Sequence, residues 1–208
     1  MFGKRFQKTL GALAVVVMLA GVAGAGFAAW PAESGGGTQE DINVHGHWMI
    51  EVSNPDGTLV ERREFDNAFD TQYGAINLAR VLTRQRTVAY WQIELTSLNF
   101  EPYFIYTIQE ANDPTTPAHN SKNLVVELIE SGDDAGTIVL SGIATAHQDG
   151  KISYVSTKLL AVGPDNAPSD TSFTGTIWGS NFTKFTLSPD VDVTEGQQVA
   201  VTVFISFS

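Results

Sequence analysis

Residues 198–207 carry an apolar side chain at every second position, and this period limits the possible folds more than any other feature. The apolar members are Val199, Val201, Val203, Ile205 and Phe207. Successive side chains of a β-strand point to opposite faces, so the period predicts a strand with one buried face. Because isolated strands are unstable in water, this segment requires a sheet around it.

Shorter runs of the same kind recur earlier in the chain. Residues 44–53 and 58–65 flank an Asn-Pro-Asp-Gly turn signal at 54–57 and predict a hairpin. Further strands are expected at residues 87–95, 103–109, 124–129, 137–146, 152–162, 173–178 and 182–187. This spacing of strands and turns predicts a mainly β fold, either an antiparallel β-sandwich or a jelly roll.

One short helix is expected near residues 71–84. Its apolar residues follow a helical period, with Asp70 or Thr71 as the N-cap. Arg80 and Arg84 lie toward its C-terminal end, where positive charge complements the helix dipole.

The first 30 residues predict export. A basic start precedes residues 9–30, which carry no charge. The small residues Ala23 and Ala25 form an A-x-A cleavage site, and Ala28 offers a second one, as in a signal peptide. The alternative is an uncleaved membrane anchor, because an apolar helix of about 20 residues spans a bilayer.

Either alternative sends the rest of the chain outward, because the basic residues stay on the inner side. We therefore expect an extracellular or cell-surface protein that contacts the membrane only through residues 9–30, and only if the leader is uncleaved. Residues 31–43 contain three consecutive glycines among polar residues and predict a flexible linker. The folded domain is expected at residues 44–208.

The charge balance argues against nucleic acid as a partner. The chain has a formal charge of −11, and its 12 basic residues include three in the leader, whereas all 23 acidic residues follow it. Such an acidic domain repels phosphate backbones. The chain has no cysteine, which excludes disulfides, thiolate metal sites and cysteine nucleophiles.

Two stretches share a pattern of Asn, Gly, Leu-Ala and alternating apolar residues. The first comprises Phe65-Asp66-Asn67, Thr71, Gly74, Leu78-Ala79, Leu82 and Trp91-Gln92-Ile93. The second comprises Phe185-Thr186-Leu187, Val191, Val193, Gly196-Gln197, Val199, Val201, Ile205 and Phe207. Residues 65–95 thereby resemble the helix and core strand that open phage tail and virion-type structural β-sandwich proteins. Residues 182–207 resemble the closing hairpin of the same proteins.

The resemblance implies structural or assembly work, with other protein subunits or surface components as partners and with a possible homo-oligomer. It supplies no catalytic residues. The leader departs from the pattern, because phage structural proteins of this kind normally have no export signal.

His45 and His47 are candidate metal ligands. At strand spacing their imidazoles lie on one face, roughly 6–7 Å apart, and His119 or His147 could supply a third ligand. The alternative is a pair of solvated histidines on an edge strand. Asp133, Asp134, Asp165, Asp190 and Asp192 offer oxygen ligands for Ca²⁺ without matching an EF-hand, so we expect no cofactor, with Ca²⁺ as the alternative.

Trp91 and Trp178 are candidate ligand-binding residues. Together with Trp48, Tyr103, Phe104 and Tyr106, these two residues could form an exposed aromatic platform that binds carbohydrate. Aromatic residues at alternating strand positions more often form the core.

No G-x-S-x-G, H-E-x-x-H or P-loop motif occurs in the sequence, so we expect no enzyme. Three other functions remain open. The first function is an exported structural, adhesive or assembly protein, and the second is a carbohydrate- or other ligand-binding module. The third is a filament subunit joined by strand exchange, with the glycine-rich residues 31–43 as donor or hinge.

The leader makes a direct prediction. Mass spectrometry of the chain from its source cell, combined with cell fractionation, should find an N-terminus created by cleavage after Ala25 or Ala28, or an intact chain in the membrane fraction. An intact chain confined to the cytoplasmic fraction would contradict export.

Overall fold

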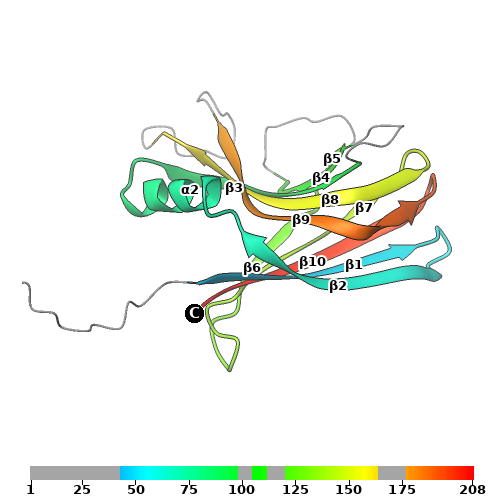
Figure 1. Ribbon diagram of the computed structural model, residues 1–208, viewed down its shortest axis with the longest axis horizontal. Coiled ribbons are helices and arrows are strands. Elements are labelled where there is room, and N and C mark those ends of the chain that lie inside the picture. The colour runs from blue at the N-terminus through cyan, green and yellow to red at the C-terminus, as the bar shows by residue number, and fades with distance from the viewer. Residues whose placement is uncertain (1–42, 98–104, 112–119, 164–176) are drawn as a thin grey trace, which may run out of the picture. The chain divides into compact units, whose positions relative to one another are not determined.

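The described part of the chain is mainly β with one short helix, as predicted (Figure 1). The structure is a computed structural model, and it describes residues 43–97, 105–111, 120–163 and 177–208. Residues 41–208 form a unit of their own, separate from residues 1–40. The predicted leader helix and most of the linker lie outside the described residues. Among those described, no helix is long and apolar enough to cross a membrane.

Ten strands and one helix follow one another along the unit. The strands are β1 (Val44–Ser53), β2 (Leu59–Phe69), β3 (Thr87–Thr96), β4 (Ile105–Gln109), β5 (Asn120–Ser121), β6 (Val125–Leu128), β7 (Ile138–Thr145), β8 (Gly150–Val162), β9 (Trp178–Val193) and β10 (Gln198–Phe207). Helix α2 spans Tyr73–Leu82, between β2 and β3.

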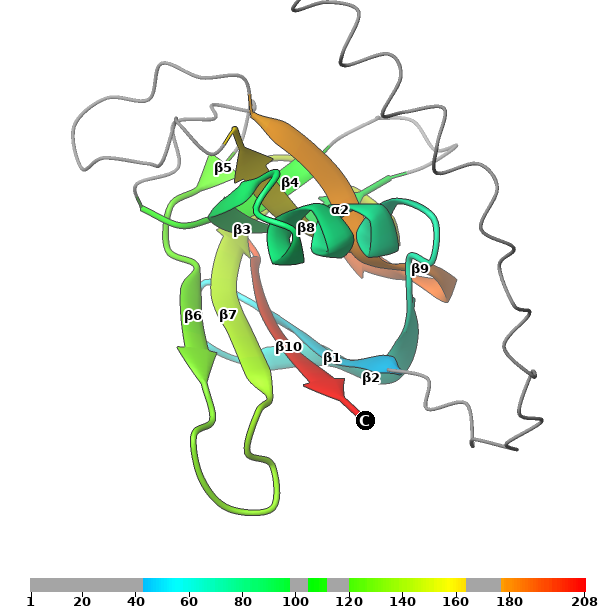
Figure 2. The same cartoon turned by 90° about the vertical axis from the view of Figure 1, so that its left-hand side faces the viewer.

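All ten strands belong to one sheet, in the order β5-β4-β3-β8-β9-β2-β1-β10-β7-β6. The pairs are antiparallel except for β4 and β5, which run parallel. β2 and β9 pair only through Ala68–Lys184 and Phe69–Thr183, so the sheet bends there. One half, with β3, β8 and β9, then lies over the other, with β1, β2 and β10 (Figures 1 and 2).

Residues 120–128 join the two edges of the curled sheet. Asn120 and Ser121 pair with β4, and Val125–Leu128 pair with β7 at the opposite edge. At the crossing, the Leu124 N–H donates to the Gln109 carbonyl at 3.0 Å. The Asn123 side chain donates to the Ile143 carbonyl at 2.9 Å and accepts from the Ile143 N–H at 3.2 Å. The Asn123 amide thus takes the place of a strand neighbour for Ile143, and the sheet closes.

The core fills the space between the two halves. A row of stacked rings crosses it, with centroid separations of 6.0 Å for Trp48–Phe65 and 4.7 Å for Phe65–Phe185. Ile108 of β4 packs so closely on Gly142 of β7 that a Cβ at Gly142 would overlap its methyl group. Both halves therefore bury their apolar faces against each other, as the alternating patterns require.

Some boundaries differ from those predicted. The segments expected at 173–178 and 182–187 belong in their described part to one strand, β9, which continues to Val193. Register shifts in its pairing with β8 interrupt the alternation that strand prediction relies on. β5 was not expected, because two residues carry no period. Residues 103–104, at the start of another expected strand, lie outside the described residues.

The closing contact gives a stability prediction. Asn123→Ala removes both hydrogen bonds to Ile143 and should lower the free energy of unfolding by about 1–2 kcal/mol in urea denaturation. Amide exchange should accelerate in β6 and at Ile143 and stay unchanged in β8 and β9. Ser131→Ala, in the exposed turn after β6, is the matched control. Uniform acceleration through the sheet, or none, would refute the closing role.

Candidate functional site

Strand register gathers one group of polar side chains at the end of the unit where β1 begins. His45 and His47 lie on one face of β1, opposite Ser206 and Phe204 of β10. On the other side of β1, His47 lies opposite Asp66 of β2. This face is the reverse of the one that carries Trp48 into the core, so it is turned to solvent.

The turn between β6 and β7 borders this face. It is held by hydrogen bonds from the Ile129 N–H to the Thr137 carbonyl (2.9 Å), from the Gly136 N–H to the Ile129 carbonyl (2.7 Å) and from the Thr137 N–H to the Asp134 carbonyl (3.1 Å). The turn and the strands enclose an open pocket of about 380 Å³. We call it the histidine pocket, and its lining residues are His45, Gly46, His47, Asp66, Asn67, Ile129, Asp134, Thr137, Phe204 and Ser206.

Both histidines make hydrogen bonds to side chains. His47 Nδ1 lies 2.8 Å from Asp66 Oδ1, and its ring centroid is 6.2 Å from that of Phe204. His45 Nε2 lies 3.0 Å from Ser208 Oγ. Because the serine and the carboxylate bind different imidazoles, the four groups do not form a Ser-His-Asp relay. The arrangement is suited to binding a polar group.

The electrostatics of the histidine pocket favour a cation. The described residues that line it include the carboxylates of Asp66 and Asp134 and no lysine or arginine. The Asp66 side chain is 89% exposed and retains oxygen lone pairs beyond its contact with His47. A planar cation would also find the face of the Phe204 ring.

The predicted metal ligands are only partly brought together. His45 and His47 share the pocket, but His147 packs its ring against Tyr106, with centroids 4.9 Å apart, and His119 lies outside the described residues. Within the described ranges no three His, Cys, Asp or Glu side chains are grouped as a metal site. Of the acidic candidates for Ca²⁺, Asp192 binds Lys151 at 3.0 Å, Asp134 lines the pocket, and Asp165 lies outside the described residues.

The predicted aromatic platform is placed differently. Trp91 is 8% exposed and packs edge-to-face on Phe182, with centroids 5.2 Å apart. Trp48 is fully buried. Trp178 begins β9 opposite Ala161, but its side chain lies outside the described part of the structure. Trp91 is therefore part of the hydrophobic core.

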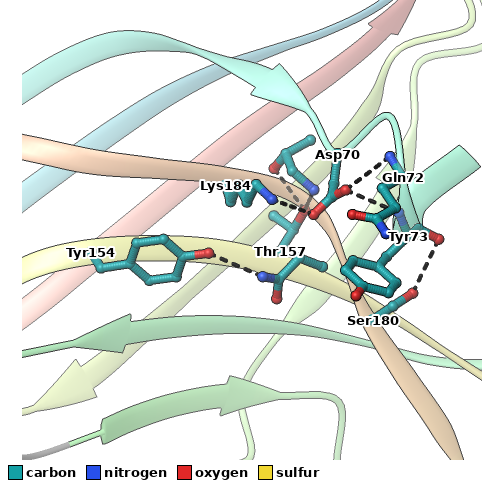
Figure 3. Close-up of polar contacts among 9 residues, drawn as sticks. Asp70, Gln72, Tyr73, Tyr154, Thr157, Ser180 and Lys184 are labelled. Atoms are coloured by element: carbon teal, nitrogen blue, oxygen red, sulfur yellow. Dashed lines mark hydrogen bonds and ion pairs between the residues drawn. The ribbon is translucent and has the colours of Figure 1, made fainter. Parts of the chain in front are cut away.

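A second polar cluster fixes helix α2 to the sheet. Asp70 follows β2, and its Oδ1 accepts hydrogen bonds from the N–H groups of Gln72 (3.1 Å) and Tyr73 (3.0 Å) (Figure 3). Its Oδ2 accepts from Lys184 Nζ at 2.7 Å. Nearby, Tyr154 accepts from Asn181 Nδ2 at 3.0 Å. The N-cap of α2 is Gln72, so the prediction of Asp70 or Thr71 as the N-cap was wrong. Asp70 instead holds the turn that leads into the helix.

This carboxylate is charged despite its burial. The Asp70 side chain is 2% exposed, and burial alone would raise its pKa. The hydrogen bond from Lys184 and those from the Tyr73 and Gln72 N–H groups outweigh burial and hold the pKa of Asp70 below its ordinary 3.8. The same contact raises the pKa of Lys184. The cluster is a structural joint between β2, α2 and β9.

The joint carries a pH prediction. Because the pKa of Asp70 is lowered by folding, its stabilisation is complete above about pH 4 and is lost as the pH falls through the folded value. Asp70→Asn keeps an oxygen for the Gln72 and Tyr73 N–H groups but removes the ion pair. It should lower the free energy of unfolding at pH 7 by about 1.5–3 kcal/mol and flatten its fall between pH 4 and 2.

Asp70→Ala separates the hydrogen bonds of the turn from the ion pair. It also loses the acceptor for the Gln72 and Tyr73 N–H groups and should cost about 1 kcal/mol more than Asp70→Asn at pH 7. Urea unfolding at several pH values measures both variants. An unchanged acid slope in Asp70→Asn would show that Asp70 is not the linked group.

Sequence reasoning did not predict Asp66 and Phe204 as site residues, and it named Asp134 only as a Ca²⁺ candidate, without the histidines. Strand register brings Asp66 and Phe204 to His47, and the turn between β6 and β7 brings Asp134 to the pocket. No protein-family model, curated protein or solved structure matches the chain. The likeness of residues 65–95 and 182–207 to phage structural proteins therefore stays a prediction, and function rests on the geometry.

Proposed function

We propose that this protein is an exported, non-enzymatic structural or assembly protein of the cell-surface or virion-like type. Support comes from the predicted leader, from the resemblance of residues 65–95 and 182–207, and above all from the outward face of α2. We also assign the curled sheet to the β-sandwich or jelly-roll class, on the grounds that two facing halves share one core.

The outward face of α2 is the observation that carries the proposal. Tyr73, Ile76 and Leu82 are 54%, 47% and 73% exposed. The opposite face rests on the sheet, where Gly74 and Asn77 are buried and Asn77 Nδ2 donates to the Leu159 carbonyl at 2.7 Å. At 100° per residue Ile76 points away from the sheet, with Tyr73 and Leu82 on opposite flanks of the helix. Large apolar side chains exposed on one element are typical of a surface that another protein covers.

The carbohydrate alternative has less support. Its two named residues were Trp91, whose ring is buried, and Trp178, whose side chain lies outside the described residues. A sugar site would therefore need other aromatic residues on the surface.

The edge strand β6 gives some support to a filament joined by strand exchange. β6 is the last strand in the sheet order, and Val125, Val126 and Leu128 are exposed along it. A donated strand could pair there. The proposed donor, residues 31–43, has few apolar side chains to pack on these three.

Surface labelling and native sizing test the proposal together. We expect a membrane-impermeant amine reagent to label the chain on intact cells. We also expect the gently extracted chain to elute in a complex larger than a monomer. An unlabelled, monomeric chain in the cytoplasmic fraction would contradict both export and assembly.

A further inference from the structure

Two surfaces of the described unit are complementary in charge, and both carry exposed apolar side chains. The first is the helix knob, defined as the exposed residues Tyr73, Ile76, Arg80, Leu82 and Arg84 at α2. Neither Arg80 nor Arg84 makes an ion pair within the described residues, whereas Arg62, Arg63, Lys151, Lys158 and Lys184 all do. In an acidic chain, the knob is a local site of uncompensated positive charge.

Arg84 has an unusual backbone conformation. Its φ of 59° is the only positive value among the described non-glycine residues. It follows the helix C-cap Thr83, and its N–H donates to the Val81 carbonyl at 3.0 Å. Glycine is the residue that adopts this conformation without strain. An arginine held there at a cost in stability points to use of its side chain.

The second surface is the histidine pocket and the turn beside it. Asp66 and Asp134 line the pocket. Exposed acidic side chains continue onto β6 and the turn, and they are Glu127, Glu130 and Asp133. Apolar side chains lie among them, since Phe204 and Ile129 line the pocket and Val125 is exposed on the same face of β6 as Glu127. This surface is acidic and apolar where the knob is basic and apolar.

The two surfaces point away from each other. Figures 1 and 2 show α2 on the side of β8 and β9, whereas the turn between β6 and β7 extends in the opposite direction. A knob therefore cannot reach the pocket of its own copy. Contact between unlike surfaces of two copies is heterologous and continues from copy to copy.

We propose that the histidine pocket receives the Arg84 side chain from the helix knob of a second copy, so that the chains assemble head to tail. The proposal rests on the proposed assembly function and names its partner. The guanidinium binds the carboxylates of Asp66 and Asp134 and lies against the Phe204 ring, while Ile76 and Leu82 cover Val125 of β6. Fork-shaped arginine donors match carboxylates better than lysine does.

Charge favours a second copy of the chain over an anionic membrane as the partner of the helix knob. A membrane of anionic lipid would attract Arg80 and Arg84 but repel a chain whose formal charge is −11. A second copy instead offers the acidic surface that the knob lacks. Lipid binding is accordingly an outcome that the experiment must be able to detect.

The experiment mixes two charge-reversed variants of the full chain, purified with the N-terminus that the cell leaves on it. Wild-type chain should form a concentration-dependent series of multimers in sedimentation velocity, and salt should weaken them. Arg84→Glu and Asp134→Lys should each weaken self-association by about tenfold or more. Mixed together, they should assemble again, because the intact knob of one variant meets the intact pocket of the other and the reversed knob meets the reversed pocket with opposite charges.

Two further variants keep the result interpretable. Arg84→Gly should raise the melting temperature by about 2–4 °C, because glycine relieves the positive φ, and should still abolish assembly. Lys151→Glu reverses an exposed charge on β8 away from both surfaces and should leave assembly unchanged. Loss of assembly together with a higher melting temperature cannot be attributed to unfolding.

Three results would overturn the inference. They are a mixture of Arg84→Glu and Asp134→Lys that stays monomeric, an Arg84→Gly variant that assembles as wild type does, and a wild-type monomer that binds phosphatidylglycerol vesicles instead. If the wild-type chain alone is monomeric but occurs in a larger complex of other proteins on the cell, this inference fails and the proposed function stands.

Discussion

The closing of one sheet by residues 120–128 is the constraint on which the rest of the unit depends. Ten strands with one apolar face need a second apolar face to cover them, and here the sheet supplies both. The short β2–β9 pairing bends it, and the contacts of Leu124 and Asn123 seal it. In the sheet order the end strands are β6 and the two-residue β5, and short end strands limit unspecific pairing with other chains.

Closure also decides where the functional surfaces lie. The chain leaves β2 at the bend and forms α2 there, with Asp70 tying the helix start to Lys184 of β9. The inner face of α2 packs on the sheet, so the apolar side chains of Tyr73, Ile76 and Leu82 remain exposed. At the opposite side, sealing brings the turn between β6 and β7 next to β10 and β1, and the histidine pocket forms between them. One fold thus presents a basic knob and an acidic pocket in different directions.

Sequence patterns predicted the helix and most of the strands, but they did not predict how the strands pair. The alternation in residues 198–207 and 44–53 reflects burial of one face, so both strands were predicted with the bounds that the structure has to within a residue. Helix α2 was predicted from its period, although its apolar residues are divided between core and surface. The histidine pocket could not be predicted from the sequence, because a bulge at Val52/Ser53 shifts the register of the hairpin by one residue. Without that shift, Phe65 would lie opposite His47, and Asp66 would be on the other face.

Head-to-tail contact between Arg84 and the histidine pocket is the central claim, and the absence of cysteine from the chain allows a direct test. A double variant with Gln85→Cys and Ser131→Cys, two exposed positions beside the contact that leave Arg84, Asp66 and Asp134 in place, is treated with a bis-maleimide at a concentration where wild-type chain assembles. It should give a ladder of covalent multimers on a denaturing gel. Each single variant should stay monomeric, because its one cysteine has no partner across a heterologous contact. A double variant without the ladder, or a single variant that forms dimers as readily, would contradict the account.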